Sequence, residues 1–318
     1  MTDLPRIVAI IGATATGKSD LAIQVAEWFR GEVVSVDSRL IYRGMDIGTA
    51  KPTRAERARV PHHLIDVVEP DETWSVARFQ SAVSALIPEI VARDRLPILV
   101  GGTGQYMRAI LQGWRPPPRP ADRRIRARLE AEVEAGRGGE LVERLKRVDP
   151  SSAETIDLRN PRRVIRALEI YEATGVPASQ QRGRSPTPFR ATCVGLTLPR
   201  PELYERIDAR IDRMIEAGLV DEVRGLLAQG FSRASPSMSA IGYREIAAHL
   251  EGAMTLEEAV RRMRQATRLF VRRQANWFRA TDPSICWFTP AEGYEAGVVE
   301  WLHGELSSFR GASSSPEA

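Results

Sequence analysis

The sequence predicts an α/β fold, a P-loop doubly wound parallel sheet with a helical insertion domain. Three observations lead to this fold class. Strand-like and helix-like apolar patterns alternate over residues 7–104, which is typical of a parallel sheet covered by helices. The first strand runs directly into a G-x-x-x-x-G-K-S motif at 12–19. A proline cluster at 116–120 then separates this region from a series of helical patterns.

The alternating region contains three predicted strands, each followed by a loop. We expect strands at 7–11, 32–36 and 97–100, and helices at 18–30 and 73–93. In parallel sheets, ligands bind beyond the carboxyl ends of the strands. The loops that begin at Gly12, Asp37 and Gly101 are therefore expected to meet at one crevice.

The rest of the chain divides into an insertion and a returning core. Residues 119–188 read as a basic helical insertion, with helices at 122–135, 139–148 and 160–174 and a Gly-, Ser- and Pro-rich loop at 183–188. The catalytic core comprises 1–118 and 189–310, with a strand at 193–198, long helices at 200–229 and 255–279, and a last short strand at 287–288. The Ser-rich tail 311–318 is expected to be disordered.

Composition limits the class of protein. No stretch approaches the roughly 18 consecutive apolar residues of a membrane span, so no membrane association is expected and a cytoplasmic location is the default. The two cysteines, Cys193 and Cys286, can form neither a disulfide framework nor a structural zinc site, and we expect both to be buried, reduced thiols. The sequence does not fix the oligomeric state, and a monomer is the working assumption.

Positive charge is concentrated in the insertion. The chain has a net charge of +4, and residues 115–190 hold 17 basic and 11 acidic residues, so this segment carries +6 and the remainder −2. Such a segment suits a polyanionic partner, since Lys and Arg neutralise phosphates. A solvated, Arg-rich helical surface would have the same composition, and charge alone does not decide between the two.

The motif at 12–19 is a phosphate cradle. Its residues are Gly12, Ala13, Thr14, Ala15, Thr16, Gly17, Lys18 and Ser19. The glycines let backbone N–H groups surround a phosphate, Lys18 contacts the terminal phosphate, and the Ser19 hydroxyl can hold Mg²⁺. The chain has 42 Arg and only 3 Lys, so a lysine at this position indicates a chemical requirement for a compact ammonium group.

The phosphate-binding motif does not by itself show which reaction the bound phosphate undergoes. P-loop hydrolases usually end a hydrophobic strand in an acid that helps to hold Mg²⁺, but the strand at 97–100 runs into Gly101 and Gly102. The acid at a strand end is Asp37. Its carboxylate can serve as a metal ligand, a hydrogen-bond acceptor or a general base, or it can simply cap a turn.

The sequence around and beyond these loops resembles the tRNA dimethylallyltransferase (isopentenyltransferase) family. The resemblance rests on S-V-D-S at 35–38, I-Y-R-G-M-D-I-G-T-A-K-P at 41–52, P-H-H-L-I-D at 61–66 and G-G-T-G at 101–104 with Tyr106. It continues through R-R at 162–163, R-A-L-E at 166–169, I-G-Y at 241–243, and the Arg, Gln and Trp residues at 268, 273, 274 and 277. These blocks lie in the family's order from about residue 7 to residue 280.

This resemblance implies transfer of a dimethylallyl group from dimethylallyl diphosphate to N6 of adenosine 37, immediately 3′ of the tRNA anticodon. In that reaction the P-loop would bind the donor's diphosphate, with Mg²⁺ held by Ser19 as the cofactor. Asp37 would take the proton from N6 as general base. Thr103 and Arg210 would contact the leaving side or the phosphate chain.

The resemblance also implies a set of tRNA contacts. They are Asp37, Ser38, Arg39, Leu40, Thr103, Arg126, Arg162, Arg163, Val164, Ile165 and Arg166. An adenine in a stacked anticodon loop must be extruded to reach the diphosphate, which demands a grip on the surrounding loop. The helix that carries Arg261, Arg264, Arg268 and Arg272 extends this surface, presents a solvated face or pairs these arginines with the core; the sequence leaves all three open.

Three rival functions share parts of this pattern. A P-loop kinase of a small molecule would share the cradle and the sheet, but not the basic insertion together with the segment 41–52. A nucleic-acid-binding ATPase would need the missing strand-end acid. An adenylate isopentenyltransferase would use the same donor on free AMP and would not need a basic insertion.

His62 and His63 are interpreted as structural or loop residues, and not as a pair of metal ligands, because adjacent side chains of a strand point apart.

Overall fold

The computed structural model describes residues 4–117 and 122–307, and the predicted tail at 311–318 lies outside them. The chain forms two compact units, one made of residues 1–111 and 187–318 and the other of residues 112–186. We call them the core unit and the helical unit. Along the part of the chain that the structure describes, no helix is both long and apolar enough to span a membrane.

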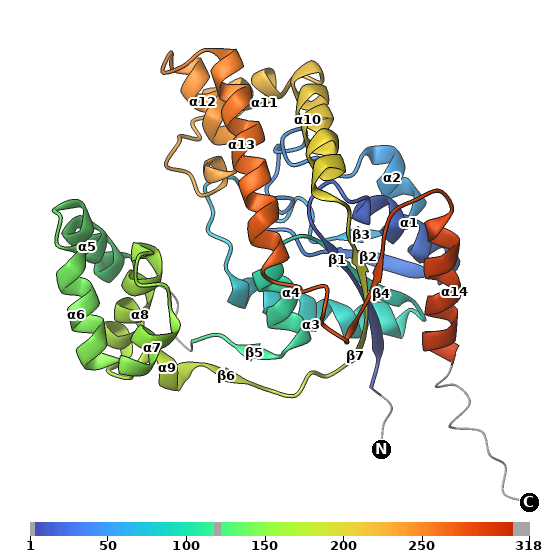
Figure 1. Cartoon of the computed structure of the whole chain (residues 1–318), viewed down its shortest axis with the longest axis horizontal. Helices are drawn as coiled ribbons and strands as arrows, with labels where there is room; N and C mark the ends of the chain where they lie inside the picture. Colours follow the sequence, from blue (N-terminus) through green and yellow to red (C-terminus); the bar gives the residue numbers. More distant parts are fainter. Residues whose placement is uncertain (1–3, 118–121, 308–318) are drawn as a thin grey trace, which may run out of the picture. The chain divides into compact units, whose positions relative to one another are not determined.

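A six-stranded parallel sheet forms the centre of the core unit (Figure 1). Its strands, in spatial order, are β3 (His62–His63), β2 (Gly31–Ser35), β4 (Leu96–Val100), β1 (Arg6–Gly12), β7 (Arg190–Leu196) and β8 (Ile285–Phe288). Each neighbouring pair is parallel. The predicted doubly wound α/β fold is therefore confirmed.

Alternating side chains of the strands bury both faces of the sheet. From β1, Ile7, Ala9 and Ile11 join a core with α3 (Val76–Ala92) and α4 (Gly104–Leu111), whereas Val8 and Ile10 join the opposite core with α1 (Lys18–Trp28) and α14 (Tyr294–Ser307). All five side chains are inaccessible to solvent. The period of two along the strand thus assigns helices to both faces.

The remaining helices of the core unit pack around a third apolar cluster. They are α10 (Arg200–Glu216), α11 (Leu219–Ala228), the short 3-10 helix η1 (Ser237–Ser239), α12 (Tyr243–Leu250) and α13 (Leu256–Ala275), and α2 (Arg54–Arg59) lies between β2 and β3 in the chain. The single helix expected at 200–229 is wrong. Gly218 adopts φ +95°, a left-handed conformation that breaks the segment into α10 and α11.

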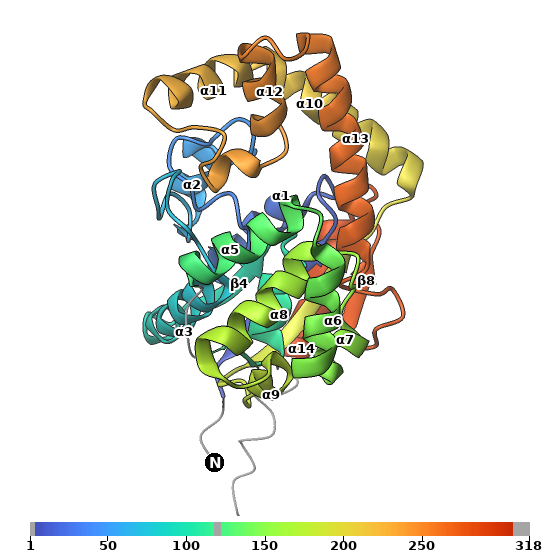
Figure 2. The ribbon, with the colours of Figure 1, turned by 90° about the vertical axis from the view of Figure 1, so that its left-hand side faces the viewer.

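The helical unit contains α5 (Arg123–Glu134), α6 (Gly138–Val148), α7 (Pro150–Thr155), α8 (Pro161–Thr174) and α9 (Ala178–Gln181) (Figure 2). Leu129, Leu141, Leu145 and Leu168 are fully buried where α5 and α6 pack on α8. The two chain segments that enter and leave this unit pair as β5 (Trp114–Arg115) and β6 (Gly183–Arg184). The compact unit begins at Gln112, earlier than the expected residue 119, and ends at Pro186.

Candidate active site

The P-loop joins β1 to α1, and its glycines occupy positions that other residues cannot. Gly12 has φ +149°, and a Cβ atom there would lie 2.5 Å from the carbonyl oxygen of Leu196. Gly17 has φ +88° at the N-cap of α1. The backbone therefore curls tightly between the strand and the helix, and directs N–H groups and the helix N-terminus into the loop.

Lys18 is buried within this loop. Its side chain donates a hydrogen bond of 2.5 Å from Nζ to the carbonyl of Ala13, which also accepts one from Thr16 Oγ1 at 2.9 Å. Burial and, to a lesser extent, the charge of nearby Arg210 lower the pKa of Lys18 to about 8, although the negative charge of Asp37 acts to raise it. The ammonium group lacks solvent and a direct carboxylate partner among the described residues, so an anion in the loop would be strongly favoured.

The loops that follow β1, β2 and β4 meet at one end of the sheet. The backbone N–H of Ser38 donates to Thr103 Oγ1 at 3.1 Å, and that of Thr103 donates to the carbonyl of Val36 at 3.4 Å. A Cβ atom at Gly101 would lie 2.1 Å from the Val36 carbonyl oxygen, so only glycine permits this approach. The structure thus brings Asp37 and Thr103 together, next to the P-loop.

Asp37 is half-buried beyond the end of β2. One of its oxygens accepts a 2.7 Å hydrogen bond from the backbone N–H of Arg39, which is the local bond that a turn cap makes. Its negative charge also raises the pKa values of Lys18 and Arg210, against the effect of their burial. Asp37 therefore lies within electrostatic range of both cations.

Arg210 reaches the P-loop from α10. Its guanidinium donates to Thr14 Oγ1 at 3.3 Å and to the carbonyl of Thr49 at 3.4 Å. Burial lowers its pKa, although an arginine remains charged. Arg210 also lines a cavity of about 520 Å³ whose other basic residues include Arg54 and Arg213. A second cation therefore stands at the phosphate cradle, held by neutral acceptors only among the described residues.

Gln274 connects the P-loop to the loop after β4, and the sequence reasoning missed this role. Its Oε1 accepts from the backbone N–H of Thr14, and its Nε2 donates to the carbonyl of Gly102, each at 2.9 Å. Gln274 is buried on α13, and a Cβ atom at Gly102 would lie 2.2 Å from its Nε2. The sequence resemblance includes Gln274 but does not say what its amide binds, because both partners lie far away in the chain.

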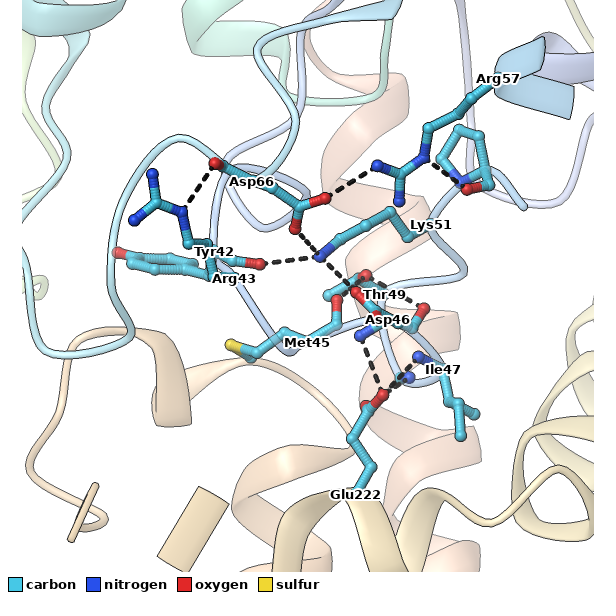
Figure 3. A network of polar contacts seen from close by, with 12 residues as sticks. Tyr42, Arg43, Met45, Asp46, Ile47, Thr49, Lys51, Arg57, Asp66 and Glu222 are labelled. Carbon is cyan, nitrogen blue, oxygen red and sulfur yellow. Dashed lines mark hydrogen bonds and ion pairs between the residues drawn. The ribbon is translucent and has the colours of Figure 1, made fainter. Parts of the chain in front are cut away.

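A polar network orders the segment 42–52, which follows Asp37 (Figure 3). Lys51 is 1% exposed and donates from Nζ to Asp46 and Asp66 at 2.5 Å each, and to the carbonyl of Tyr42 at 2.8 Å. Glu222 of α11 binds the other side of this segment through backbone N–H groups. The sequence resemblance includes this segment, but it does not show which groups Lys51 and Glu222 bind.

The predicted tRNA contacts beside Asp37 have partners inside the core unit. The guanidinium of Arg39 donates to the carbonyl of Pro236 at 3.0 Å and to Ser239 Oγ at 3.1 Å. Ser38 and Leu40 are half-buried. The backbone of Ser38 is already engaged with Thr103.

The other predicted contacts lie on α5 and α8 of the helical unit. Glu169, 1% exposed, pairs with Arg126 at 2.8 Å and with Arg166 at 3.0 Å, while Arg162 and Arg163 are exposed. Val164 and Ile165 have their side chains buried in the apolar core of this unit. Any surface formed here for a ligand consists of the arginines, and the side chains of Val164 and Ile165 have no part in it.

The arginines of α13 are paired within the core unit, mostly with α10. Arg264 and Arg268 form ion pairs with Asp212 and Asp208, and Arg272 donates to the hydroxyl of Tyr204. Arg261 pairs with Glu258 on its own helix. Arg264 and Arg268 are therefore half-buried in pairs with α10, whereas Arg261 and Arg272 are exposed, so no single reading describes all four arginines.

Ser19 is the residue of this site best suited to a metal ion. Its side chain is exposed at the start of α1, and its hydroxyl has no hydrogen-bond partner in the described chain. Residues 4–117 and 122–307 contain no group of three or more His, Cys, Asp or Glu that could hold a metal. A hard cation here would take most of its ligands from a bound phosphate and water, as Mg²⁺ commonly does.

The histidines and cysteines outside the site have structural surroundings. His63 shares a 2.7 Å hydrogen bond with Glu32, and His62 shares one of 2.9 Å with the carbonyl of Val60. Cys193 is buried, as expected, but Cys286 is only half-buried on the edge strand β8.

Comparison with known proteins identifies the family. Residues 40–281 match the family model described as IPP transferase. The chain is 56% identical over 276 residues to a tRNA dimethylallyltransferase of Roseiflexus castenholzii, covering 86% of this chain and 89% of that protein. A tRNA dimethylallyltransferase of Thermomicrobium roseum is 50% identical over 273 residues, covering 86% of this chain and 83% of the relative.

Solved structures agree with these matches. The tRNA isopentenylpyrophosphate transferase of Bacillus halodurans is 41% identical, with a TM-score of 0.71 over 95% of this chain and 97% of that one. A eukaryotic dimethylallyltransferase acting on tRNA is 26% identical, with a TM-score of 0.81 over 98% of this chain and 81% of the other. With its P-loop, the adjoining Asp37 and Thr103, and this similarity over most of its length, the chain belongs to the IPP transferase family.

Proposed function

We propose that this protein transfers a dimethylallyl group from dimethylallyl diphosphate to N6 of the adenosine 3′ of the anticodon in tRNA. The products are N6-dimethylallyladenosine and diphosphate. The observation that carries this proposal is the meeting of three loops at one end of the sheet, where a phosphate cradle with buried Lys18 and half-buried Arg210 adjoins a carboxylate and a hydroxyl. The names of the relatives support the same reaction.

The donor's diphosphate would lie in the P-loop. Backbone N–H groups of the loop, Lys18 and Arg210 would bind its oxygens and stabilise the negative charge that develops as the C–O bond to the allylic carbon breaks. Thr103 would contact the leaving side. The residues fit Mg²⁺, because the exposed hydroxyl of Ser19 stands at the N-terminus of α1. A bound Mg²⁺ would add further charge neutralisation at the diphosphate.

Asp37 would act as the general base. The N6 amine attacks the allylic carbon, the new C–N bond forms as diphosphate leaves, and the surplus N6 proton passes to the carboxylate. A strand-end acid that activates water is not needed, which agrees with the loop after β4 beginning with Gly101 and Gly102.

The tRNA would be held through its backbone while the target adenine is extruded. Arg126, Arg162, Arg163 and Arg166 of the helical unit are the proposed phosphate contacts, together with the segment Asp37 to Leu40 and Thr103 in the core unit. Phosphate contacts of this kind position a nucleic acid without reading its sequence. With tRNA as the substrate, we place the protein in the cytoplasm and treat the monomer as the working unit.

The decisive assay combines purified protein, dimethylallyl diphosphate, Mg²⁺ and unmodified tRNA. We expect the mass of one dimethylallyl group on a single adenosine per tRNA, with release of an equal amount of diphosphate. Parallel reactions contain AMP in place of tRNA, or ATP without tRNA. Transfer to AMP alone, or phosphate release from ATP, would overturn the proposal.

Substitution of Asp37 tests the proposed base. Asp37→Ala and the isosteric Asp37→Asn are expected to lower the transfer rate by about 10²–10⁴-fold, the usual contribution of general base catalysis. Binding of tRNA, measured by filter binding, should be largely retained in both variants. An unchanged transfer rate would remove Asp37 from the mechanism.

A further inference from the structure

Glu222 makes an unusual set of contacts with the segment 42–52 (Figure 3). Its Oε2 accepts from the backbone N–H groups of Asp46 at 2.9 Å and Ile47 at 2.8 Å, and its Oε1 accepts from that of Gly48 at 3.2 Å. Three successive N–H groups around one carboxylate form an anion-binding nest. The nest binds a side chain of this protein itself, so it fixes the backbone of the segment.

A buried tyrosine holds Glu222 in this position. The hydroxyl of Tyr243 donates to its Oε1 at 2.5 Å, and the Tyr243 side chain is inaccessible to solvent. A Cβ atom at Gly48 would lie 2.5 Å from the Tyr243 ring, so glycine is needed for the backbone to approach. Glu222 forms no ion pair with another described residue, and its charge is balanced by these donors and by the N-terminal turn of α11.

The ordered segment leads directly to Arg210. The residue after Gly48 is Thr49, whose carbonyl accepts from Nη2 of Arg210 at 3.4 Å, while Nη1 donates to Thr14 in the P-loop at 3.3 Å. Both bonds are long and their acceptors are neutral, so each restrains the guanidinium only weakly. Arg210 also lines a cavity, and these two are the hydrogen bonds that the described residues offer its guanidinium, so a shift of the Thr49 carbonyl would remove one of them.

We propose that Glu222 is a positioning residue for Arg210. By fixing the backbone at Asp46 to Gly48, it sets the Thr49 carbonyl, which keeps the guanidinium directed at Thr14. The inference rests on the proposed function in one respect, that the P-loop receives the donor's diphosphate. Glu222 itself does not touch the ligand.

The test measures inorganic pyrophosphate binding by calorimetry, together with transfer kinetics, in Glu222→Ala and Glu222→Gln. We expect Glu222→Ala to weaken pyrophosphate binding and raise the KM for dimethylallyl diphosphate by about tenfold, the scale of one lost hydrogen bond to a charged group. The KM for tRNA should not change. Glu222→Gln keeps one acceptor but replaces the other with a donor, and an intermediate loss is expected.

The matched control is Asp221→Ala. Asp221 precedes Glu222 in the same turn of α11 and pairs only with exposed Arg224, so its removal costs the helix a similar charge without touching the segment 42–52. Wild-type pyrophosphate binding is expected for this variant. If Asp221→Ala and Glu222→Ala lose the same affinity, the effect is general destabilisation of α11 and the proposal is wrong.

A double-mutant comparison separates positioning from stability. If Glu222 acts through Arg210, the variant carrying both Glu222→Ala and Arg210→Ala should bind pyrophosphate no more weakly than Arg210→Ala alone. Losses that multiply would overturn the proposal. Should Glu222→Ala fail to fold, Glu222→Gln takes its place in the same cycle.

Lys18→Ala distinguishes failure of this inference from failure of the proposed function. Pyrophosphate binding that is lost in Lys18→Ala but intact in Glu222→Ala would refute only the role of Glu222. Binding that does not depend on Lys18 would instead refute the P-loop as the diphosphate site.

Discussion

At the scale of single residues, the site contains buried charged groups that are each held by particular hydrogen-bond and ion-pair partners. Lys51 is the clearest case, since its ammonium is enclosed by two carboxylates and a carbonyl. Burial acts to raise the pKa of Asp66, but hydrogen bonds from Lys51 and Arg57 outweigh it and hold that pKa below its usual value. Ionised Asp66 therefore stabilises the folded state.

This arrangement predicts a pH-dependent stability contribution. Because the folded-state pKa of Asp66 lies below the unfolded value of about 3.9, the contribution is complete above about pH 4 and is lost as the pH falls through the folded value. At pH 7, Asp66→Asn is expected to cost about 1–3 kcal/mol. Thermal unfolding of both proteins from pH 7 to pH 3 should show the gap in Tm closing at the acid end; a constant gap would contradict the prediction.

Ser19 gives a second prediction at this scale. Chelation of divalent metal is expected to abolish transfer, and Ser19→Ala should raise the Mg²⁺ concentration needed for half-maximal rate by about tenfold, because the variant lacks the hydroxyl that we propose as a ligand of the ion. Ser19→Thr retains the hydroxyl and serves as the control. Equal Mg²⁺ dependence in all three proteins would exclude Ser19 as a ligand.

At the scale of elements, α13 connects the loop that follows β1 with the loop that follows β4. Gln274 bonds to both the P-loop and the loop after β4, so its helix sets their spacing. Elsewhere α13 is fixed to α10 by Arg264 and Arg268, which pair with aspartates of that helix. Because α10 carries Arg210, the two helices together position Arg210 and Gln274 at the P-loop.

Removal of the Gln274 amide should loosen this spacing. Gln274→Ala leaves the Thr14 N–H and the Gly102 carbonyl without their partner, and we expect the KM for dimethylallyl diphosphate to rise by about 10–100-fold, which corresponds to about 1–3 kcal/mol. Gln265→Ala is the matched control, because that glutamine is exposed on the same helix. A similar KM in both variants would show that the bridge has no role in donor binding.

At the scale of the whole molecule, the chain divides into the core unit and the basic helical unit. The helical unit builds its own apolar core, and its arginines are distributed between ion pairs and the surface. Arg126 and Arg166 share buried Glu169, whereas Arg162 and Arg163 are exposed at the first turn of α8. The exposed pair is therefore the sharpest test of the proposed tRNA surface.

Arg162→Ala and Arg163→Ala should each weaken tRNA binding similarly for different tRNA sequences. Each lost phosphate contact is expected to reduce the slope of log affinity against log salt by about 0.7–0.9. Arg147→Ala removes an exposed charge from α6 of the same unit and is the control. If all three variants change the slope equally, only net charge matters and α8 has no special role.

Local sequence patterns predicted much of the fold and part of the candidate site. The alternation of Ile7 to Ile11 predicted a strand buried on both faces, the glycines at 12 and 17 predicted the cradle, and the ends of β2 and β4 predicted that Asp37 and Gly101 would lie together. Each of these features is encoded within a few consecutive residues or in the general rule for parallel sheets. The helix break at Gly218 was missed because a helix-like apolar period continues on both sides of it.

By itself, then, the sequence determined the α/β class, the phosphate cradle, the carboxylate at a strand end and the basic character of the insertion. Only the tertiary structure decided that Gln274 bonds to two loops, that Glu222 holds the segment leading to Arg210, and that Arg264 and Arg268 pair with α10 while Val164 and Ile165 are buried. The physical reason is the separation along the sequence of the residues that interact. Backbone conformation follows from neighbouring residues, whereas hydrogen bonds and ion pairs between residues that are 52 or more positions apart exist only once the packed helices bring their atoms together.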